Sequence, residues 1–323
     1  MTRKVGTIAE STVREGMRQV ASERVATLSP DTARARVGEY VELCKPKVVV
    51  LLIFTAVVGM FLSVPGMVPW SPLVFGTIGI GLAAASGAAF NHVVDRRIDQ
   101  VMNRTSGRPL PTGQVDARSA FLFALSLTAA SMVILVGFVN WLTAVLTFFS
   151  MVAYAVVYTI YLKHMTPQNI VVGGAAGAMP PVLGWTAVTG QVDPHALLLF
   201  LIIFVWTPPH FWALAIHRAD DYARAEVPML PVTHGIPFTR IQIMFYTVLL
   251  FVVGLLPYIT RMSDVIYLVA AVVLGLGFLY YAVRLLWCSD PHIPMRMFGY
   301  SIVYLAGTFA ALLIDHYVPL SWG

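Results

Sequence analysis

The sequence predicts an all-α protein that crosses a membrane nine times. Of its 323 residues, 58% are hydrophobic and only 11% are charged, and the mean hydropathy is +0.76. Soluble domains carry about 25% charged residues, so this composition is typical of a membrane protein. The apolar residues form long stretches, and none of these alternates apolar and polar residues as a membrane β-barrel strand does.

Nine stretches of the chain lack Asp, Glu, Lys and Arg over roughly the 20 residues that an α-helix needs to cross a bilayer. Each stretch is therefore predicted to be a transmembrane helix. In chain order they are residues 48–64, 72–94, 119–138, 142–162, 169–189, 196–216, 241–260, 265–283 and 297–314.

The basic residues predict the orientation of these helices. With a cytoplasmic N-terminus, 20 of the 21 Lys and Arg residues fall in cytoplasmic segments, and only Arg261 falls on the far side. Lys and Arg are enriched in cytoplasmic loops, so we expect this orientation, with the C-terminus on the far side. The net charge of +5 then follows from topology, and the expected surroundings are a lipid bilayer with no nucleic acid partner.

Residues 1–44 differ from the rest of the chain. They mix Arg, Glu, Ser and Thr and lack the apolar core of a secretory signal peptide, while their acidic residues are unlike a mitochondrial transit peptide. We expect a polar cytoplasmic tail there, followed by a transmembrane domain over residues 45–323. The two cysteines, Cys44 and Cys288, lie near predicted cytoplasmic membrane edges and are expected to be reduced and unpaired.

The connection after the second predicted helix is long and polar. Asn91, Asp95 and Asp99 are spaced four apart, so on a helix they line one face. Carboxylates placed this way repel one another, and a divalent cation removes that repulsion. Mg²⁺ binds one or two carboxylates and completes its shell with waters and substrate phosphate oxygens. Asp95 and Asp99 are therefore candidate ligands of Mg²⁺.

Arginines surround these acids. Arg96, Arg97, Arg104 and Arg108 carry planar guanidinium groups that suit phosphate, so the connection is predicted to bind a Mg²⁺–diphosphate group. The alternative is a solvated, salt-bridged loop that only follows the positive-inside rule. That alternative fits single arginines well, but topology does not require two carboxylates one turn apart at the edge of a span.

The connection after the sixth predicted helix repeats the pattern. Asp220 and Asp221 follow that helix, with Arg218 and Arg224 beside them. Both connections lie on the cytoplasmic side, so the two acidic clusters are expected to face each other. Metal ions held between them would neutralise a departing diphosphate and so stabilise the transition state.

Two other classes of protein fit part of the pattern. A transporter often has broken helices, which the proline pairs at 180–181 and 208–209 would provide. However, a transporter places coordinating groups near the membrane midplane, and here the charges lie at one surface. A structural subunit of a respiratory complex would not need two facing acidic clusters.

The two connections also carry a resemblance. The first matches the pattern N-x3-D-x3-D-x2-M-x-R-T-x2-R-P at Asn91, Asp95, Asp99, Met102, Arg104, Thr105, Arg108 and Pro109. The segments 208–212, 221–222 and 228–232 resemble a second motif region, and 45–47 and 169–174 also fit. In these motifs the chain resembles the UbiA-type intramembrane prenyltransferases, and within them the protohaem IX farnesyltransferase branch. The resemblance covers roughly residues 43–240.

This resemblance implies a nine-helix UbiA-type bundle in the cytoplasmic membrane of a bacterium. It implies transfer of a farnesyl group from farnesyl diphosphate to a vinyl group of haem b, with Mg²⁺ as cofactor and water added to give haem O. The implied metal-organising residues are Asn91, Asp95, Asp99 and Asp221, with Asp220 as a weaker candidate. The implied diphosphate-binding residues are Arg104, Arg108, Arg218 and Lys163.

The second motif departs from the wider family, which spaces two acids as D-x3-D. Here Asp220 and Asp221 are adjacent and residue 225 is Ala, so one of the pair is expected to contact metal, and Asp221 is favoured because it precedes the tyrosine. The loop at Lys163 is also less basic than is usual in the family, which weakens its diphosphate role.

The acceptor is the least determined part of the resemblance. His92 and His210 are candidates to ligate or orient haem iron, although a lone histidine in a bundle is more often a hydrogen-bonded packing residue. A quinone precursor or another tetrapyrrole is the alternative acceptor, and the R-T-x2-R-P and P-M-L-P segments favour haem. Pathway logic adds haem A synthase as a possible partner.

Overall fold

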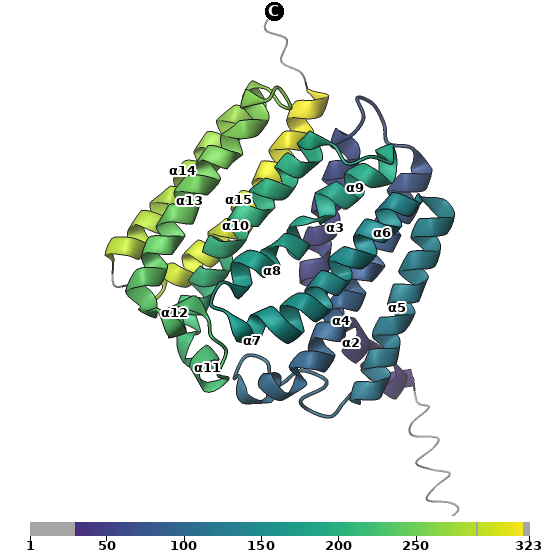
Figure 1. Cartoon of the computed structure of the whole chain (residues 1–323), viewed down its shortest axis with the longest axis vertical. Helices are drawn as coiled ribbons and strands as arrows, with labels where there is room; N and C mark the ends of the chain where they lie inside the picture. Colours follow the sequence, from purple (N-terminus) through teal and green to yellow (C-terminus); the bar gives the residue numbers. More distant parts are fainter. Residues whose placement is uncertain (1–29, 289, 319–323) are drawn as a thin grey trace, which may run out of the picture.

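The computed structural model describes residues 30–288 and 290–318, which form helices and no β-strand (Figure 1). The long helices run side by side in one bundle, and short helices cover one end of it. In chain order the elements are α2 (Pro30–Leu43), α3 (Pro46–Leu62), η1 (Pro72–Gly76), α4 (Thr77–Val101), α5 (Ala117–Phe138), α6 (Trp141–Val152), η2 (Ala153–Leu162), α7 (Lys163–Met165), α8 (Asn169–Ala178), α9 (Pro180–Thr189), α10 (Pro194–His217), α11 (Ala219–Arg224), α12 (Leu230–Thr233), α13 (Gly235–Ile259), α14 (Val265–Trp287) and α15 (Ile293–Tyr317).

The predicted spans correspond to these helices. Over the described residues, eight helices are long and apolar enough to cross a membrane, and a ninth span forms if the bent pair Arg36–Leu43 and Pro46–Leu62 counts as one. The two helices of this pair meet at an angle of 50°. The all-α membrane fold is therefore confirmed. Of the predicted polar tail, residues 1–29 lie outside the described residues, and α2 contains most of the remainder.

Several helix boundaries follow from capping residues. Asp116, Asn140, Asp193 and Asp264 precede α5, α6, α10 and α14, and each side chain accepts a hydrogen bond from a backbone N–H of the first turn. These caps satisfy donors that have no partner inside the helix. At the end of α9, Gly190 adopts φ 70°, a conformation that glycine adopts without strain.

Two glycines let α3 and α9 cross in backbone contact. A Cβ atom added at Gly184 would lie 1.9 Å from the carbonyl oxygen of Ala56, and one added at Gly59 would lie 2.3 Å from that of Pro181. No larger residue fits at either position without moving a helix. Small residues at such crossings are typical of membrane bundles, where packing drives association.

Irregular helix geometry occurs in three of the spans. Two stretches are π-helical, η1 before α4 and η2 between α6 and α7, and π-helix is frequent at functional sites. The proline pair at 180–181 separates α8 from α9, whereas α10 continues through Pro208 and Pro209. Of the two proline pairs, only 180–181 therefore interrupts its span, and the continuous helix predicted over residues 196–216 is confirmed.

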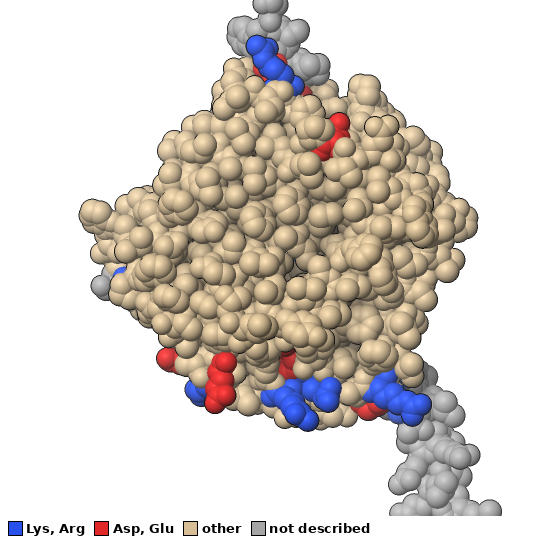
Figure 2. Space-filling model, viewed as in Figure 1, with Lys and Arg blue, Asp and Glu red and all other residues tan. Residues whose placement is uncertain are grey.

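The charged residues gather at the ends of the bundle. Figure 2 shows Lys, Arg, Asp and Glu along the bottom edge, a few at the top, and almost none over the broad band between. The tryptophans Trp70, Trp141 and Trp287 are exposed and lie next to or at the ends of spans, as expected of residues at membrane–water interfaces. The band is therefore suited to contact lipid.

The end of the bundle without the acidic connections is closed by α15. His316 Nε2 lies 2.9 Å from the carbonyl oxygen of Val64, and Tyr317 donates a hydrogen bond to that of Gly66. Asp315 is buried and accepts hydrogen bonds from the Ser263 side chain and from the backbone N–H groups of Asp264, just before α14, and Tyr267, in its first turn. The last span is thus tied to the loops after α3 and α13.

Candidate active site

The first acidic cluster lies on α4, near the end of the bundle that carries most of the charge. This helix continues to Val101, two turns past the predicted end of its span, so Asn91, Asp95 and Asp99 are all helical. Asp95 is 4% exposed and Asp99 is 3% exposed. Buried carboxylates are strongly unfavourable unless they are paired, so their partners define the site.

Asp99 is held by the loop that follows α4. Arg108 Nη1 donates to both carboxylate oxygens of Asp99, at 2.9 and 2.7 Å. Thr105 donates to the backbone carbonyl of Asp99 at 3.1 Å. The R-T-x2-R segment therefore folds back onto the helix that precedes it, and this return brings Arg108 to the acid.

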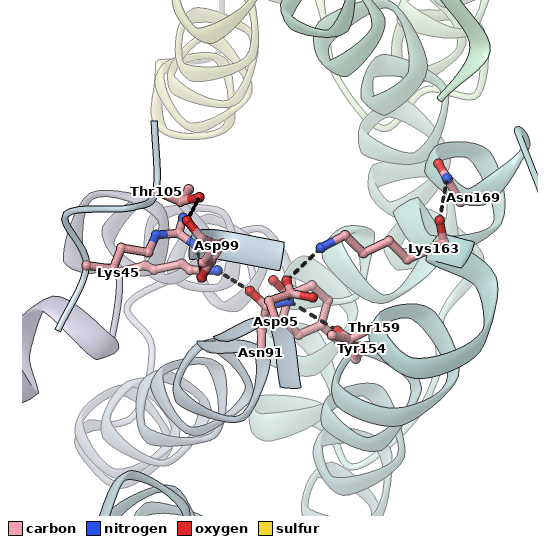
Figure 3. Close-up of polar contacts among 10 residues, drawn as sticks. Lys45, Asn91, Asp95, Asp99, Thr105, Tyr154, Thr159, Lys163 and Asn169 are labelled. Carbon is pink, nitrogen blue, oxygen red and sulfur yellow. Dashed lines mark hydrogen bonds and ion pairs between the residues drawn. The ribbon is translucent and has the colours of Figure 1, made fainter. Parts of the chain in front are cut away.

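Asp95 is held by Lys163 at the start of α7, which directly follows η2 (Figure 3). Lys163 Nζ lies 2.7 Å from Asp95 Oδ2, and Asn91 donates to the same oxygen at 2.8 Å. The other oxygen, Oδ1, is buried without a hydrogen-bond partner among the described residues. Lys163 was predicted to bind diphosphate, and the structure places it in direct contact with the acid.

Asn91 connects three elements. Its amide nitrogen also donates to Thr159 of η2 at 3.3 Å, and its oxygen accepts from Lys45 Nζ at 2.5 Å. Lys45 precedes α3 and lies within electrostatic reach of both acids. We call Lys45, Asn91, Asp95, Asp99, Arg108 and Lys163 the ionic cluster. No site role was predicted from the sequence for Lys45 or Thr159. The one signal that could have indicated Lys45 was its place in segment 45–47, which fits the family resemblance.

The second acidic cluster is built on α11. Asp221 is buried and forms ion pairs with Arg224 and with Arg218, whose Nη1 lies 3.7 Å away. Asp220 is exposed to solvent. The structure thus buries Asp221, the residue that the sequence favoured, and leaves its neighbour at the surface.

Tyr222 lies within electrostatic reach of residues from both connections. Burial raises the pKa of Tyr222, and the positive charges that oppose this shift come from Arg104 and Arg108 as well as from Arg218. The first two belong to the connection after α4, and the third precedes α11. Arg104 and Arg108 of the connection after α4 therefore lie within electrostatic reach of α11, and the facing of the two acidic clusters stays a prediction.

The arginines nearest the acids in sequence are not in the site. Arg96 and Arg97 are exposed, and Arg96 donates to the carbonyl of Val93 in its own helix. For these two residues the alternative of a solvated basic loop describes the structure better. The distant Arg108 and Lys163 supply the contacts instead.

The two candidate histidines lie in different surroundings. His92 is 2% exposed, neither ring nitrogen has a hydrogen-bond partner among the described residues, and Lys45 and Arg108 lie within electrostatic reach. His210 is 7% exposed, and its Nδ1 lies 2.5 Å from Ser301 Oγ of α15. Ser301 was missed by the sequence because the resemblance did not reach α15.

The donor set of the first cluster fits Mg²⁺. No group of three or more His, Cys, Asp or Glu side chains within residues 30–288 and 290–318 is arranged to hold a metal by itself. Magnesium sites that also bind phosphate need only one or two carboxylates. The unpartnered Oδ1 of Asp95 and the carboxylate of Asp99 are oxygen donors of this kind.

Known proteins share both the sequence and the fold. Residues 52–310 match the UbiA prenyltransferase family. A relative from Thioalkalivibrio sulfidiphilus, named protoheme IX farnesyltransferase, is 62% identical over 281 residues, which cover 87% of this chain and 93% of its own. A relative of the same name from Nitrosococcus oceani is 59% identical, with 87% and 94% covered.

Solved structures are similar in fold at low sequence identity. A structure of digeranylgeranylglyceryl phosphate synthase aligns with a TM-score of 0.73 at 18% identity, covering 88% of this chain and 99% of its own. A UbiA homologue from Archaeoglobus fulgidus, bound to DMAPP and Mg²⁺, aligns with a TM-score of 0.58 at 16% identity, with 85% and 99% covered. Because the family pattern covers most of the chain and the relatives are so similar, the chain belongs to the UbiA prenyltransferase family.

Proposed function

We propose that the protein transfers the farnesyl group of farnesyl diphosphate to a vinyl group of haem b, with addition of water, to give haem O. The observation that carries the chemistry is the ionic cluster, in which two buried carboxylates are surrounded by cations at one end of a membrane bundle. The acceptor is supported by the relatives at 62% and 59% identity, which are named protoheme IX farnesyltransferase.

The reaction balances without an oxidant or reductant. The bond between C1 of the farnesyl chain and the diphosphate oxygen breaks, and its electron pair leaves with diphosphate. The vinyl π electrons form the new carbon–carbon bond to C1. The resulting cation next to the porphyrin ring adds water and loses a proton, which leaves a hydroxyl group.

Asp95, Asp99 and Asp221 are the residues proposed to hold Mg²⁺, and Asn91 orients Asp95. When bound, the metal would supply positive charge that stabilises the departing diphosphate. The A. fulgidus homologue, described as bound to DMAPP and Mg²⁺, supports this assignment. Asp220 is a poor ligand candidate because its side chain is exposed.

Arg108 and Lys163 are proposed to bind the diphosphate. Arginine has five N–H donors and lysine has three, whereas Arg108 contacts Asp99 through one nitrogen only and Lys163 contacts a single oxygen of Asp95. Both residues therefore keep donors for phosphate oxygens. Arg104 and Arg218 lie within electrostatic reach of Tyr222 and are proposed to complete the anion site.

The apolar parts of both substrates are proposed to occupy the membrane-embedded bundle, with the charged end of the molecule facing the cytoplasm of a bacterium. The bacterial relatives and the gathering of basic residues at one end support this placement. His92 and His210 are the side chains proposed to contact haem. Haem A synthase is proposed as a later partner because haem O is the product.

A reconstituted assay tests this function. Purified protein in nanodiscs receives haem b, farnesyl diphosphate and Mg²⁺, and the pigment is followed by reverse-phase chromatography and mass spectrometry. We expect a haem that has gained a farnesyl group and a hydroxyl. The product should be absent without Mg²⁺ and in Asp95→Ala, and present in Arg97→Ala, whose arginine is exposed outside the site.

Two negative outcomes of this assay would contradict different parts of the proposed function. If haem b stays unchanged while a quinone precursor is prenylated, the acceptor is wrong and the family activity stands. If farnesyl diphosphate stays intact with every acceptor, prenyl transfer itself is excluded.

A further inference from the structure

His210 is held more rigidly than a histidine that only fills space. It lies on α10 and packs against α15. Its ring is stacked between Trp206 and Phe298, at centroid distances of 4.2 and 4.4 Å. Trp206 also donates from Nε1 to the carbonyl of Ser301 at 2.8 Å, which fixes the two helices in register beside the ring.

The contacts of Ser301 favour one tautomer of His210 over the other. Its hydroxyl donates to the carbonyl of Phe298 at 2.6 Å, and a serine hydroxyl has one proton to give. When the hydroxyl proton is given to Phe298, the same oxygen accepts from Nδ1 of His210, and this arrangement favours the tautomer with its proton on Nδ1. A neutral imidazole with a proton on Nδ1 has a lone pair on Nε2.

We propose that Nε2 of His210 ligates the iron of haem and that Ser301 is the residue that positions it. Histidines that ligate a metal donate their other N–H to an oxygen, which fixes the tautomer and the ring orientation. Nε2 has no hydrogen-bond partner within the part of the chain that the structure describes. This inference rests on the proposed function, because it takes haem b as the substrate.

His92 lacks these features. Neither of its ring nitrogens is anchored, and its nearest charges are those of Lys45 and Arg108 in the ionic cluster. Nothing in the described residues selects one tautomer or one ring orientation for it. His92 is therefore the weaker candidate for the iron ligand.

The position of His210 is compatible with transfer at the ionic cluster. It lies seven residues before the end of α10 at His217, about 10 Å at a rise of 1.5 Å per residue. The same helix leads directly to α11 and Asp221. A porphyrin held there lies in the half of the bundle that contains the acids.

Spectroscopy of the haem b complex tests the proposal without farnesyl diphosphate. Wild-type protein and the variants His210→Ala, Ser301→Ala and Ser301→Thr are titrated with haem b, and the ferrous complexes are examined by resonance Raman spectroscopy. Ser131→Ala is the matched control, because Ser131 is also buried and donates to a carbonyl, that of Gly79, away from any histidine contact.

We expect His210→Ala to lose the iron–histidine stretching band and added imidazole to restore it. Ser301→Ala should keep the band at a lower frequency and bind haem about 10- to 100-fold more weakly, because it removes the partner of the ligating ring. Ser301→Thr, which keeps the hydroxyl, and Ser131→Ala should resemble wild type.

Two results would overturn the proposal. An unchanged band in His210→Ala assigns the iron to another ligand, and an unchanged frequency in Ser301→Ala removes the positioning role. The farnesyl transfer assay is scored separately. Turnover with no histidine-dependent band contradicts this inference alone, whereas a His210-dependent band without turnover contradicts the proposed reaction and leaves the haem site standing.

Discussion

Asn91 illustrates how single residues organise the site. It contacts Lys45, Asp95 and Thr159, which come from three separate elements. The four-residue spacing on α4 was sufficient to predict that Asn91, Asp95 and Asp99 share a face, because helical periodicity is local. Lys45 and Thr159 are 46 and 68 positions away from Asn91 in sequence. Their contacts with Asn91 can therefore be identified only in the folded structure.

The adjacent acids of α11 provide a matched pair of variants. Asp221 is buried with two arginine partners, and Asp220 is exposed. We expect Asp221→Asn to lower the rate of farnesyl transfer by about 100-fold or more, the magnitude found when a charge-stabilising group is removed. Asp220→Asn should change it by less than about threefold, as for ordinary surface positions. Equal losses in both variants would contradict the assignment of Asp221.

At the scale of elements, hydropathy predicted the spans well because the bilayer imposes one length on every helix. It gave no information on geometry within a span. The π-helix η2 carries Thr159 and leads to Lys163, and the bend between α2 and α3 lies beside Lys45. Both departures depend on packing between helices, which a window of sequence does not contain.

The crossing of α3 and α9 makes a prediction about stability. Gly184→Ala would place a methyl group against the backbone of Ala56, so we expect the protein to lose about 1–3 kcal/mol, as for other overpacked positions. Gly177→Ala in α8 has no neighbouring atom within 4 Å and should be neutral or slightly stabilising, since alanine favours the helix. Thermal unfolding in detergent measures both. A Gly184→Ala protein as stable as wild type would show that the helices do not cross as described.

The whole molecule has two chemically different ends. The ionic cluster and the second acidic cluster, on α11, lie at one end of the bundle. The contacts of Asp315, His316 and Tyr317 close the other end. Because the two ends are separate, a variant at the end closed by α15 should change the stability of the protein with little effect on the site.

Asp315 tests this separation. Asp315→Asn removes a charged acceptor from three hydrogen-bond donors of the loop before α14 and its first turn, so we expect a stability loss of about 1–3 kcal/mol. The KM for farnesyl diphosphate should not change, because the site lies at the opposite end. The checks are thermal unfolding and steady-state kinetics, and a raised KM with unchanged stability would argue against independent ends.

Cysteine labelling in intact cells tests the orientation. In a background of Cys44→Ser and Cys288→Ser, Gly66→Cys places a thiol at the end closed by α15, and Ser106→Cys places one in the loop after α4; both positions are exposed. With the charged end in the cytoplasm, an impermeant maleimide should label position 66 and reach position 106 only after lysis. The reverse pattern would invert the topology.

The ion pairs of the ionic cluster also act as internal counterions. Asp95 and Lys163 cancel each other's charge at 2.7 Å before any substrate arrives, so a buried site tolerates its own acids in a membrane protein. Removing one partner leaves a buried, uncompensated charge, whereas removing both does not. The double variant Asp95→Asn/Lys163→Met should therefore unfold at a higher temperature than Asp95→Asn alone, and we expect it to be inactive. On the proposed function, the Mg²⁺–diphosphate complex would bind among acids and cations that are already paired with one another in the fold.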